Sequence, residues 1–236
     1  MRKIITMVGT AVVAAALLAA AGTAAAQASV RLIVPNASPA CGTQCFDLSS
    51  LVLGTGTIQN AYVAGDTGIG GKVGQKVNLR HATNTSPNED FTGAQVGTLL
   101  DYCGNLISAT SYVCVNYPTS YPVFESAWSP WGNQTGLCAG VAFADIPGEN
   151  VTLQPCGQTA RTMWVGDLAH SLTYQGHLYT PWVNASDPNY SHPLVLTVNT
   201  ASSRPWNQLV LARLNLLNNH TVPDNQEFTL VAGPAI

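Results

Sequence analysis

The sequence predicts an all-β protein, and three observations lead to this class. Short runs of Val, Leu, Thr and Tyr recur along the chain, among them residues 30–34, 77–79, 151–153 and 194–198. Gly, Asn, Pro or Asp bounds each run, as expected where strands are joined by turns. No segment shows a sustained helical period, and residues 209–217 fit a strand followed by a turn as well as a helix. Many short strands separated by turn residues predict a sandwich or a barrel.

The first 28 residues have the pattern of an export signal. Arg2 and Lys3 precede an apolar run from Ile4 to about Ala21, and small residues follow that suit signal peptidase. A membrane anchor is the alternative, but the Ala-rich run and the A-x-A sites favour cleavage. We therefore expect residues 1–28 to be a signal peptide and 29–236 to form a single domain. That domain should be secreted, extracellular and free of the membrane after cleavage.

The composition of the mature region excludes one class of partner. Removing Arg2 and Lys3 changes the net charge from −3 to −5 and leaves 7 basic side chains. So few basic groups cannot neutralise a phosphate backbone, and we expect no nucleic-acid partner. About 208 residues remain, with low charge and many Gly, Pro, Asn, Ser and Thr residues. This profile is typical of a loop-rich folded domain rather than a disordered chain.

All 6 cysteines lie in the mature region, and an even number after an export signal predicts disulfides. Proximity in the sequence favours the pairs Cys41–Cys45, Cys103–Cys114 and Cys138–Cys156. The third pair is favoured most, because it links the ends of two adjacent predicted strands. Cys41–Cys45 would close a very small loop and is favoured least. No C-x-x-C pair or His cluster suggests a metal site, so we expect no metal and no cofactor.

One strand pattern occurs three times along the chain. The middle copy has a strand ending at Cys138, a second strand ending at Cys156 and a third that contains Trp164. A fainter first copy comprises residues 45–48, 77–80 and 88–91. A third copy, without cysteines, comprises residues 194–197, 208–211 and 225–228. Three degenerate copies of one pattern predict a threefold architecture.

These copies resemble the repeats of ricin-type (QxW) β-trefoil lectins. Such a repeat combines a Cys-x-Asp strand, an apolar-Gln-Leu strand that ends in Cys, and a Gln-x-Trp strand. The middle copy matches best, with Thr162 where the family has Gln. The resemblance implies a β-trefoil-like barrel of three degenerate repeats, at about 41–100, 133–170 and 190–236, with long loop insertions. It also implies three core aromatics, Phe91, Trp164 and Phe228. Secreted actinobacterial proteins with the same degenerate repeats are similar too.

The resemblance also implies where a sugar would bind. The family uses the Asp of Cys-x-Asp, an aromatic side chain and the Asn before Gln-x-Trp. The first copy keeps Asp47 and Asn88 but has Arg80 at the aromatic position. The other copies have lost most of these residues: the second has Gly140, Gln154 and Arg161, and the third keeps Asn225. Asp47 and Asn88 are therefore the predicted ligands of a carbohydrate or an extracellular polysaccharide. The alternative is that Asp47 only caps a turn.

Two stretches are predicted to be loops outside the core. Residues 54–74 contain seven glycines, and residues 116–136 contain prolines and five aromatic residues, Tyr117, Tyr121, Phe124, Trp128 and Trp131. The aromatic stretch is either a platform for a sugar or a partner, or a satellite cluster packed on the barrel. A structural or partner-binding extracellular protein that uses this stretch is the main alternative to a lectin.

No motif of a hydrolase is present, so we expect no enzyme. The chain has no G-x-S-x-G elbow and no H-E-x-x-H motif. A Ser/His/Asp constellation could be assembled only from residues scattered over one region, Asp167, His170, Ser171, His177, Asp187, Ser191 and His192. Triads are defined by geometry, and no spacing here enforces one. Polar loop residues are the simpler interpretation, with a secreted hydrolase as the remaining alternative.

Overall fold

The computed structural model describes residues 45–52, 62–66, 71–81, 91–143, 146–189, 191–200, 207–218 and 221–232. The predicted signal peptide, the strand expected at 30–34, Cys41 and Asn88 lie outside these residues. Asp47 is placed by its backbone alone. The described residues are mostly in β-strands with a few short helices, so the all-β prediction is confirmed.

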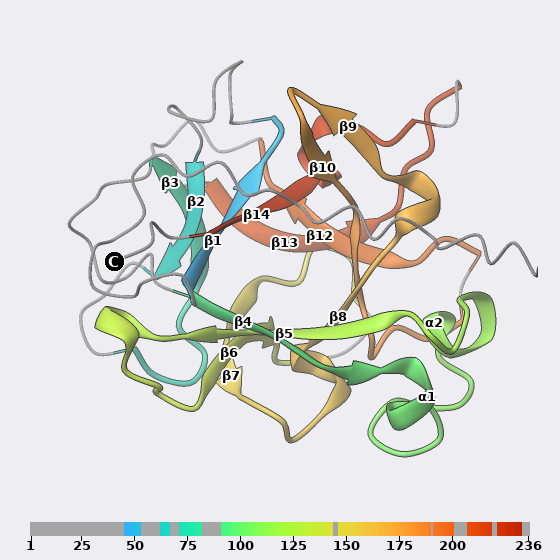
Figure 1. Cartoon of the computed structure of the whole chain (residues 1–236), viewed down its shortest axis with the longest axis horizontal. Coiled ribbons are helices and arrows are strands. Elements are labelled where there is room, and N and C mark those ends of the chain that lie inside the picture. Colours follow the sequence, from blue (N-terminus) through green and yellow to red (C-terminus); the bar gives the residue numbers. More distant parts are fainter. Residues whose placement is uncertain are drawn as a thin grey trace, which may run out of the picture.

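Twelve strands of the described residues join in one sheet that falls into three groups of four (Figure 1). The first group comprises β1 (Cys45–Ser50), β2 (Tyr62–Asp66), β3 (Val77–His81) and β4 (Phe91–Thr98). The second comprises β5 (Pro122–Trp128), β6 (Leu137–Val141), β7 (Val151–Pro155) and β8 (Met163–Gly166). The third comprises β11 (Trp182–Asn184), β12 (Leu194–Val198), β13 (Asn207–Arg213) and β14 (Phe228–Ala232).

The first and last strand of each group form a closed barrel. β1 pairs with β4, β4 with β5, β5 with β8, β8 with β11, and β14 with β1. Two backbone hydrogen bonds between Thr180 and Phe228, of 2.9 and 3.2 Å, join β14 to the segment that leads into β11 and close the ring. Among the described residues, closure of the ring pairs each of these six barrel strands on both sides, which is how barrels remove sheet edges.

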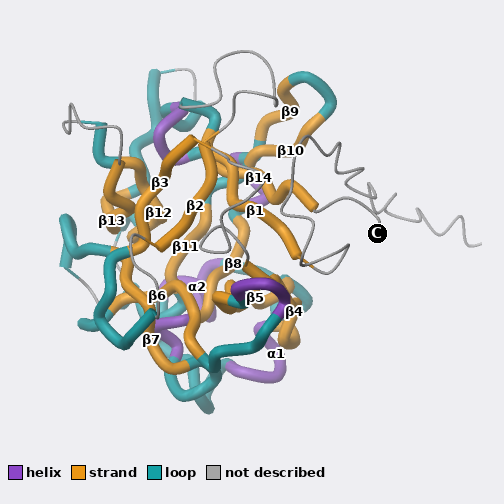
Figure 2. The backbone as a smooth tube through the Cα atoms, turned by 90° about the vertical axis from the view of Figure 1, so that its left-hand side faces the viewer, coloured by secondary structure: helices purple, strands orange, loops and turns teal. Residues whose placement is uncertain are grey.

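The middle strands of each group form hairpins that meet at one end of the barrel (Figure 2). The three hairpins are β2–β3, β6–β7 and β12–β13. β3 pairs with β13, while single bridges join Lys76 to Thr152 and Asn150 to Val210. Each hairpin therefore contacts both others around a common axis. Six barrel strands closed at one end by three hairpins make a β-trefoil, which confirms the predicted fold.

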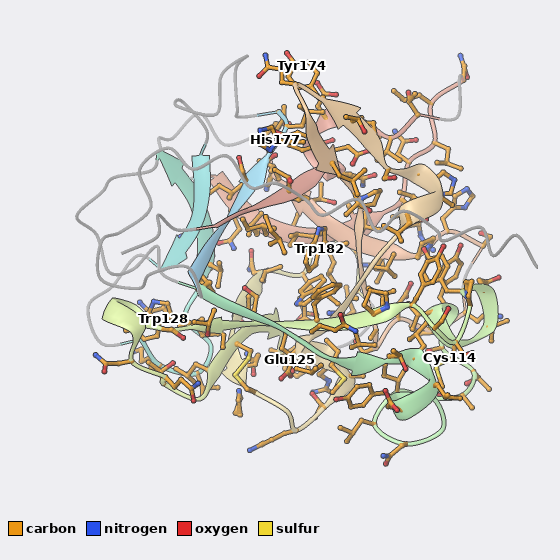
Figure 3. All side chains as sticks on the ribbon, in the orientation of Figure 1. Cys114, Glu125, Trp128, Tyr174, His177 and Trp182 are labelled. Carbon is orange, nitrogen blue, oxygen red and sulfur yellow. A yellow bond between two sulfur atoms is a disulfide. The ribbon has the colours of Figure 1, made fainter. Side chains whose placement is uncertain are left out.

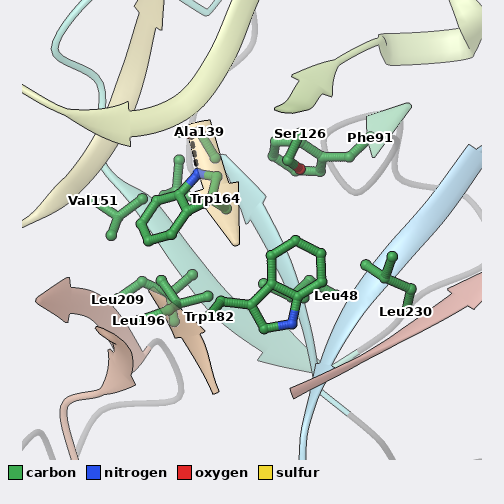
Figure 4. A pocket seen from close by; sticks show the side chains of 11 residues that line it. Leu48, Phe91, Ser126, Ala139, Val151, Trp164, Trp182, Leu196, Leu209 and Leu230 are labelled. Carbon is green, nitrogen blue, oxygen red and sulfur yellow. Dashed lines mark hydrogen bonds between the residues drawn. The ribbon is translucent and has the colours of Figure 1, made fainter. Parts of the chain in front are cut away.

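The predicted core aromatics Phe91, Trp164 and Phe228 are all buried, with exposed fractions of 1%, 3% and 0%. Each lies at the start of the fourth strand of its group. Phe91 and Trp164 pair with the first strands of two groups, and Phe228 pairs with β1 and with Thr180 just before β11. They pack with leucines and valines of the hairpins, and the indole Nε1 of Trp164 donates to the carbonyl of Ala139 at 2.9 Å (Figure 4). The cavity left between them is about 20 Å³, which is room for at most one water. The barrel centre is therefore packed and cannot hold a ligand.

Insertions separate the three groups. Between β4 and β5 lie the helices α1 (Leu99–Tyr102) and α2 (Tyr112–Asn116), which the Cys103–Cys114 disulfide joins. Between β8 and β11 lies a separate hairpin, β9 (Leu172–Tyr174) and β10 (His177–Tyr179). Four short 3₁₀ helices complete the described elements: η4 (Pro130–Gly132), η5 (Ala160–Thr162), η6 (Leu168–His170) and η7 (Asp224–Gln226).

The predicted loops differ from the structure in two places. Residues 116–136 are not a loop outside the core. They include β5, which is a strand of the barrel wall, and Trp128 on this strand is only 3% exposed (Figure 3). The glycine-rich stretch 54–74 contains β2. As a result the second and third groups begin at Pro122 and Trp182, before the expected positions 133 and 190. The clearest sequence patterns lie on the second strands of both repeats, so the sequence places the starts of these repeats too late.

Two of the predicted disulfides are present, Cys103–Cys114 and Cys138–Cys156. The second bridges β6 to the residue that follows β7, as expected from the ends of adjacent strands. The third predicted pair involves Cys41 and so lies outside the described residues. Among the helices described, none has the length and apolar character needed to cross a membrane.

Candidate functional site

The strand register aligns the three repeats residue by residue. In the pairing of the first and second strands, Val63, Cys138 and Val195 occupy equivalent positions, opposite Ser49, Ala127 and Val183. Across the hairpins these residues face Arg80, Gln154 and Ala212. Arg80 and Gln154, to which the resemblance assigns the aromatic position, are therefore equivalent residues of the first two repeats.

The same register separates the two segments that were matched as Cys-x-Asp. Cys45 lies on β1 and Cys138 on β6, which are the first and second strands of their repeats. The counterpart of Gly140 in the first repeat is Gly65, and that of Asp47 in the second repeat is Glu125. Asp47 itself lies opposite Val231 on β14. Asp47 and Asn88 as sugar ligands stay a prediction, and the register adds that Asp47 belongs to the barrel wall.

Glu125 shows what a carboxylate does at this place in the second repeat. It is buried, and its Oε1 accepts hydrogen bonds from the Thr162 hydroxyl at 2.6 Å and from the Gly157 N–H at 2.8 Å. Thr162 stands where the family has Gln, and in the third repeat Gln226 fills that place. Gln226 bonds the backbone directly, donating to the carbonyl of Arg213 at 2.9 Å and accepting from the N–H of Asn215 at 2.9 Å. The side chain of Thr162 is shorter, and Glu125 lies between its hydroxyl and the N–H of Gly157, whereas Gln226 accepts directly from the N–H of Asn215.

In the second repeat the position of the sugar-binding Asp is closed. A side chain at Gly140 would place its Cβ 2.7 Å from the carbonyl oxygen of Arg161, which is closer than real Cβ atoms approach. The Arg161 guanidinium donates to the carbonyl of Ala142 at 2.7 Å, and the Gln154 amide donates to the Thr152 hydroxyl at 2.8 Å. The contact at Gly140 leaves no room for a carboxylate, and Arg161 and Gln154 already bond within the repeat.

In the third repeat internal bonds also occupy the corresponding residues. Thr197 is buried, and its hydroxyl donates to the carbonyl of Val195 at 3.0 Å and contacts the Gln226 amide at 3.2 Å. The amide of Asn225 donates to the carbonyl of Val198 at 3.3 Å. Ala212 provides no ring for stacking. In the second and third repeats, the residues at these positions are therefore small or held in internal hydrogen bonds.

The residues of the possible Ser/His/Asp constellation form separate contacts. Nδ1 of His170 lies 2.7 Å from a carboxylate oxygen of buried Asp167, but the Ser171 hydroxyl donates to the carbonyl of Leu168 instead. Ser191 and His192 contact each other at 3.2 Å on the surface. Asp187 accepts from the N–H of Leu194 at 2.7 Å. In the described part of the chain, these contacts do not bring a serine, a histidine and an aspartate together as a triad.

Several buried polar side chains without hydrogen-bond partners among the described residues are not predicted from the sequence. Glu227 is fully buried, and neither of its carboxylate oxygens has a hydrogen-bond partner among the described residues. Burial raises the pKa of Glu227 to about 8, and nearby Asp224 and Asp167 add to the rise. Thr229 and Ser49, which face each other across β14 and β1, have buried hydroxyls without partners among the described residues.

His177, on β10, is also buried (Figure 3). Neither of its ring nitrogens has a partner among the described residues, and burial lowers its pKa. A neutral histidine and a neutral glutamic acid in apolar surroundings are the expected result. Sequence gave no signal for them, because each sits in an ordinary strand or turn pattern.

The aromatic residues before β5 form a packed cluster. The rings of Tyr117 and Tyr121 stack at 5.4 Å, and Tyr112 meets Tyr117 edge-on at 5.7 Å. All three pack against the core cluster beneath α2, and burial raises the pKa of Tyr117. The satellite-cluster interpretation therefore describes them better than an open platform. No group of three or more His, Cys, Asp or Glu side chains in the described residues is arranged to hold a metal.

Comparisons with known proteins agree with the fold. No protein-family model matches the sequence, and a search of curated proteins gives no match. Among solved structures, ThreeFoil, a designed 3-fold symmetric protein, has a TM-score of 0.50 at 13% identity, covering 80% of this chain and 99% of its own. The hemolytic lectin CEL-III has a TM-score of 0.41 at 11% identity, covering 82% of this chain and 33% of its own. The Haemophilus ducreyi cytolethal distending toxin has a TM-score of 0.45 at 9% identity, covering 87% and 90%. At 13% identity the likeness to ThreeFoil concerns the fold alone.

Proposed function

We propose that this β-trefoil protein is exported and binds carbohydrate through its first repeat. Support comes from the fold, from the resemblance to ricin-type repeats, and from the closed positions in the other two repeats. Gly140 has no room for a side chain, and Thr197 and Asn225 are held in internal bonds. The first repeat is the one that has Asn88 together with Asp47 and Asp66 in its sequence.

The chemistry of a sugar suits these residue types. A carboxylate accepts hydrogen bonds from two neighbouring hydroxyls, and an amide both donates and accepts. Asp47 is the carboxylate that the sequence predicts. Asp66, which follows Gly65 on β2, is the carboxylate next to the position that the register assigns. Carbohydrate binding by this repeat requires one of the two, together with Asn88.

A glycan array tests the proposal, using the oxidised mature protein and single variants of it. We expect saturable binding of a glycan that Asn88→Ala reduces at least about tenfold, the scale of one lost hydrogen bond to a charged or well-placed group. Asp47→Ala and Asp66→Ala assign the carboxylate. Gln154→Ala and Arg161→Ala, the counterparts of Arg80 and Asn88, serve as matched controls and should bind normally. Absence of any glycan binding, or equal loss in the controls, contradicts the proposal.

A further inference from the structure

A second cavity lies at the end of the barrel away from the three hairpins. Its volume is about 270 Å³, just below the range usual for small-molecule sites. Residues from four parts of the chain line it, among them Phe124 on β5, Gly166 on β8, Leu178 on β10 and Phe228 on β14. Trp182 on β11 and Leu230 on β14 line this cavity and also the small central cavity (Figure 4).

The threefold alignment explains why this cavity exists. The counterpart of Gly166 in the third repeat is Leu230, since each lies two residues after the buried aromatic, Trp164 or Phe228. The counterpart of Phe124 in the third repeat is Thr180. Two positions that could hold large side chains are therefore small, and they face the same space. Gly93 occupies the position of Gly166 in the first repeat, so the departure from the repeat pattern is Thr180, where the other two repeats have Phe46 and Phe124.

The walls indicate what the cavity would hold. Phe124 and Trp182 form an aromatic corner, with ring centroids 5.5 Å apart and planes tilted by 52°. The described lining residues are apolar apart from two threonines, and none of them carries a charge. A charged group would lose its hydration there without a partner, whereas a flat apolar ring would replace water against apolar walls. An uncharged aromatic molecule satisfies both conditions.

We propose that this end of the barrel is a binding site for an uncharged aromatic small molecule. The entrance lies beside η6 and β10, where Leu168 lines the cavity and remains 45% exposed. The site is distinct from the first-repeat hairpin and does not depend on carbohydrate binding. Its residues come from the second and third repeats and from the β9–β10 insertion.

The test titrates the oxidised mature protein with 2-naphthol and with 2-naphthoate, which carries the same ring system and a negative charge. Indole N–H signals in ¹H–¹⁵N spectra report the site, with the Trp182 signal assigned from Trp182→Phe. We expect saturable binding of 2-naphthol that shifts the Trp182 signal, and binding of 2-naphthoate at least about tenfold weaker because its carboxylate has no cation to meet. No saturable binding of 2-naphthol, or equal affinity for both probes, overturns the proposal.

Two sets of variants locate the binding. Gly166→Leu introduces the leucine that the third repeat has at this position. It should reduce 2-naphthol affinity at least about tenfold by filling the cavity. Gly166→Ala fits without a clash, since its Cβ would lie 3.5 Å from a Thr180 methyl, and should weaken binding by a smaller factor. Leu168→Ala should weaken binding, while Leu217→Ala, which is also 45% exposed but remote from the lining, should not. Unchanged affinity in both Gly166 variants contradicts the assigned site.

Discussion

Glu227 occupies the place in the third repeat that Met163 occupies in the second. Both side chains are buried, and Met163 packs in an apolar cluster beneath the helical insertion. A methionine needs no partner there, whereas a carboxylic acid without one costs free energy when it ionises. Burial therefore holds the pKa of Glu227 at about 8, so the folded protein keeps a proton on this group at neutral pH.

This raised pKa predicts how stability changes with pH. Between an unfolded pKa of 4.5 and a folded pKa of about 8, only the folded state holds the proton, so stability is greatest below this window and falls as pH rises through it. His177, whose pKa is lowered, acts in the opposite direction only below its ordinary value of 6.5. From pH 6.5 to 8 we therefore expect the free energy of unfolding to fall by up to about 1.4 kcal/mol per pH unit because of Glu227.

Urea unfolding at several pH values measures this slope. Glu227→Met should flatten it and should be more stable than the parent at pH 8, since it restores the residue of the second repeat. Glu149→Gln is the control, because Glu149 is a half-buried carboxylate that bonds the N–H of Phe143. A parent slope that survives in Glu227→Met would show that other groups cause it.

Substitution by alanine should change the free energy of unfolding differently at Gly140 and at Gly166. A Cβ at Gly140 would lie 2.7 Å from the backbone oxygen of Arg161, whereas one at Gly166 would make only ordinary contacts. Gly140→Ala should therefore lower the free energy of unfolding by about 1–3 kcal/mol, the usual cost of overpacking. Gly166→Ala should be neutral or slightly stabilising. Thermal unfolding of the two variants in parallel checks this, and equal stability of both would refute the closure of the second-repeat position.

The two described disulfides belong to different kinds of element. Cys138–Cys156 holds the β6–β7 hairpin, which contacts both other hairpins, and it closes a loop of 18 residues. Cys103–Cys114 holds the helical insertion. Replacing Cys138 and Cys156 by alanine should cost about 3 kcal/mol of unfolding free energy. Replacing Cys103 and Cys114 should instead mainly lower hydrogen-exchange protection within α1 and α2, because this region can open locally. A larger loss of global stability in the second variant would contradict this assignment.

Strands with a strong apolar pattern could be predicted from the sequence, and the others could not. Residues 77–79, 151–153 and 194–198 are strands as expected, and Phe91, Trp164 and Phe228 are the core aromatics. β2 is not predicted because Gly65 within it and the glycines around it weaken the strand pattern, although pairing with β1 and β3 compensates. β5 was missed because prolines surround it and its aromatics suggested a surface. Register is what placed Asp47 on the barrel wall, and no single sequence fixes register between distant strands.

The whole molecule consists of three repeats that share one fold and differ in their side-chain contacts. The second repeat has the disulfide-held hairpin and the Glu125 network, and the third has the Gln226 network and an ionisable core position at Glu227. The second and third repeats together leave the apolar cavity at the open end. The fold survives because each repeat keeps one buried aromatic and one hairpin at the common axis. Binding functions can therefore differ from repeat to repeat.

The most direct test is chemical-shift mapping of the ¹⁵N-labelled mature protein with the glycan that binds best. Backbone signals of β2 and β3, at Val63 and Arg80, should move on titration. Their counterparts Cys138, Gln154, Val195 and Ala212 should stay in place. Movement in the second or third repeat instead, or in all three alike, would contradict carbohydrate binding through the first repeat.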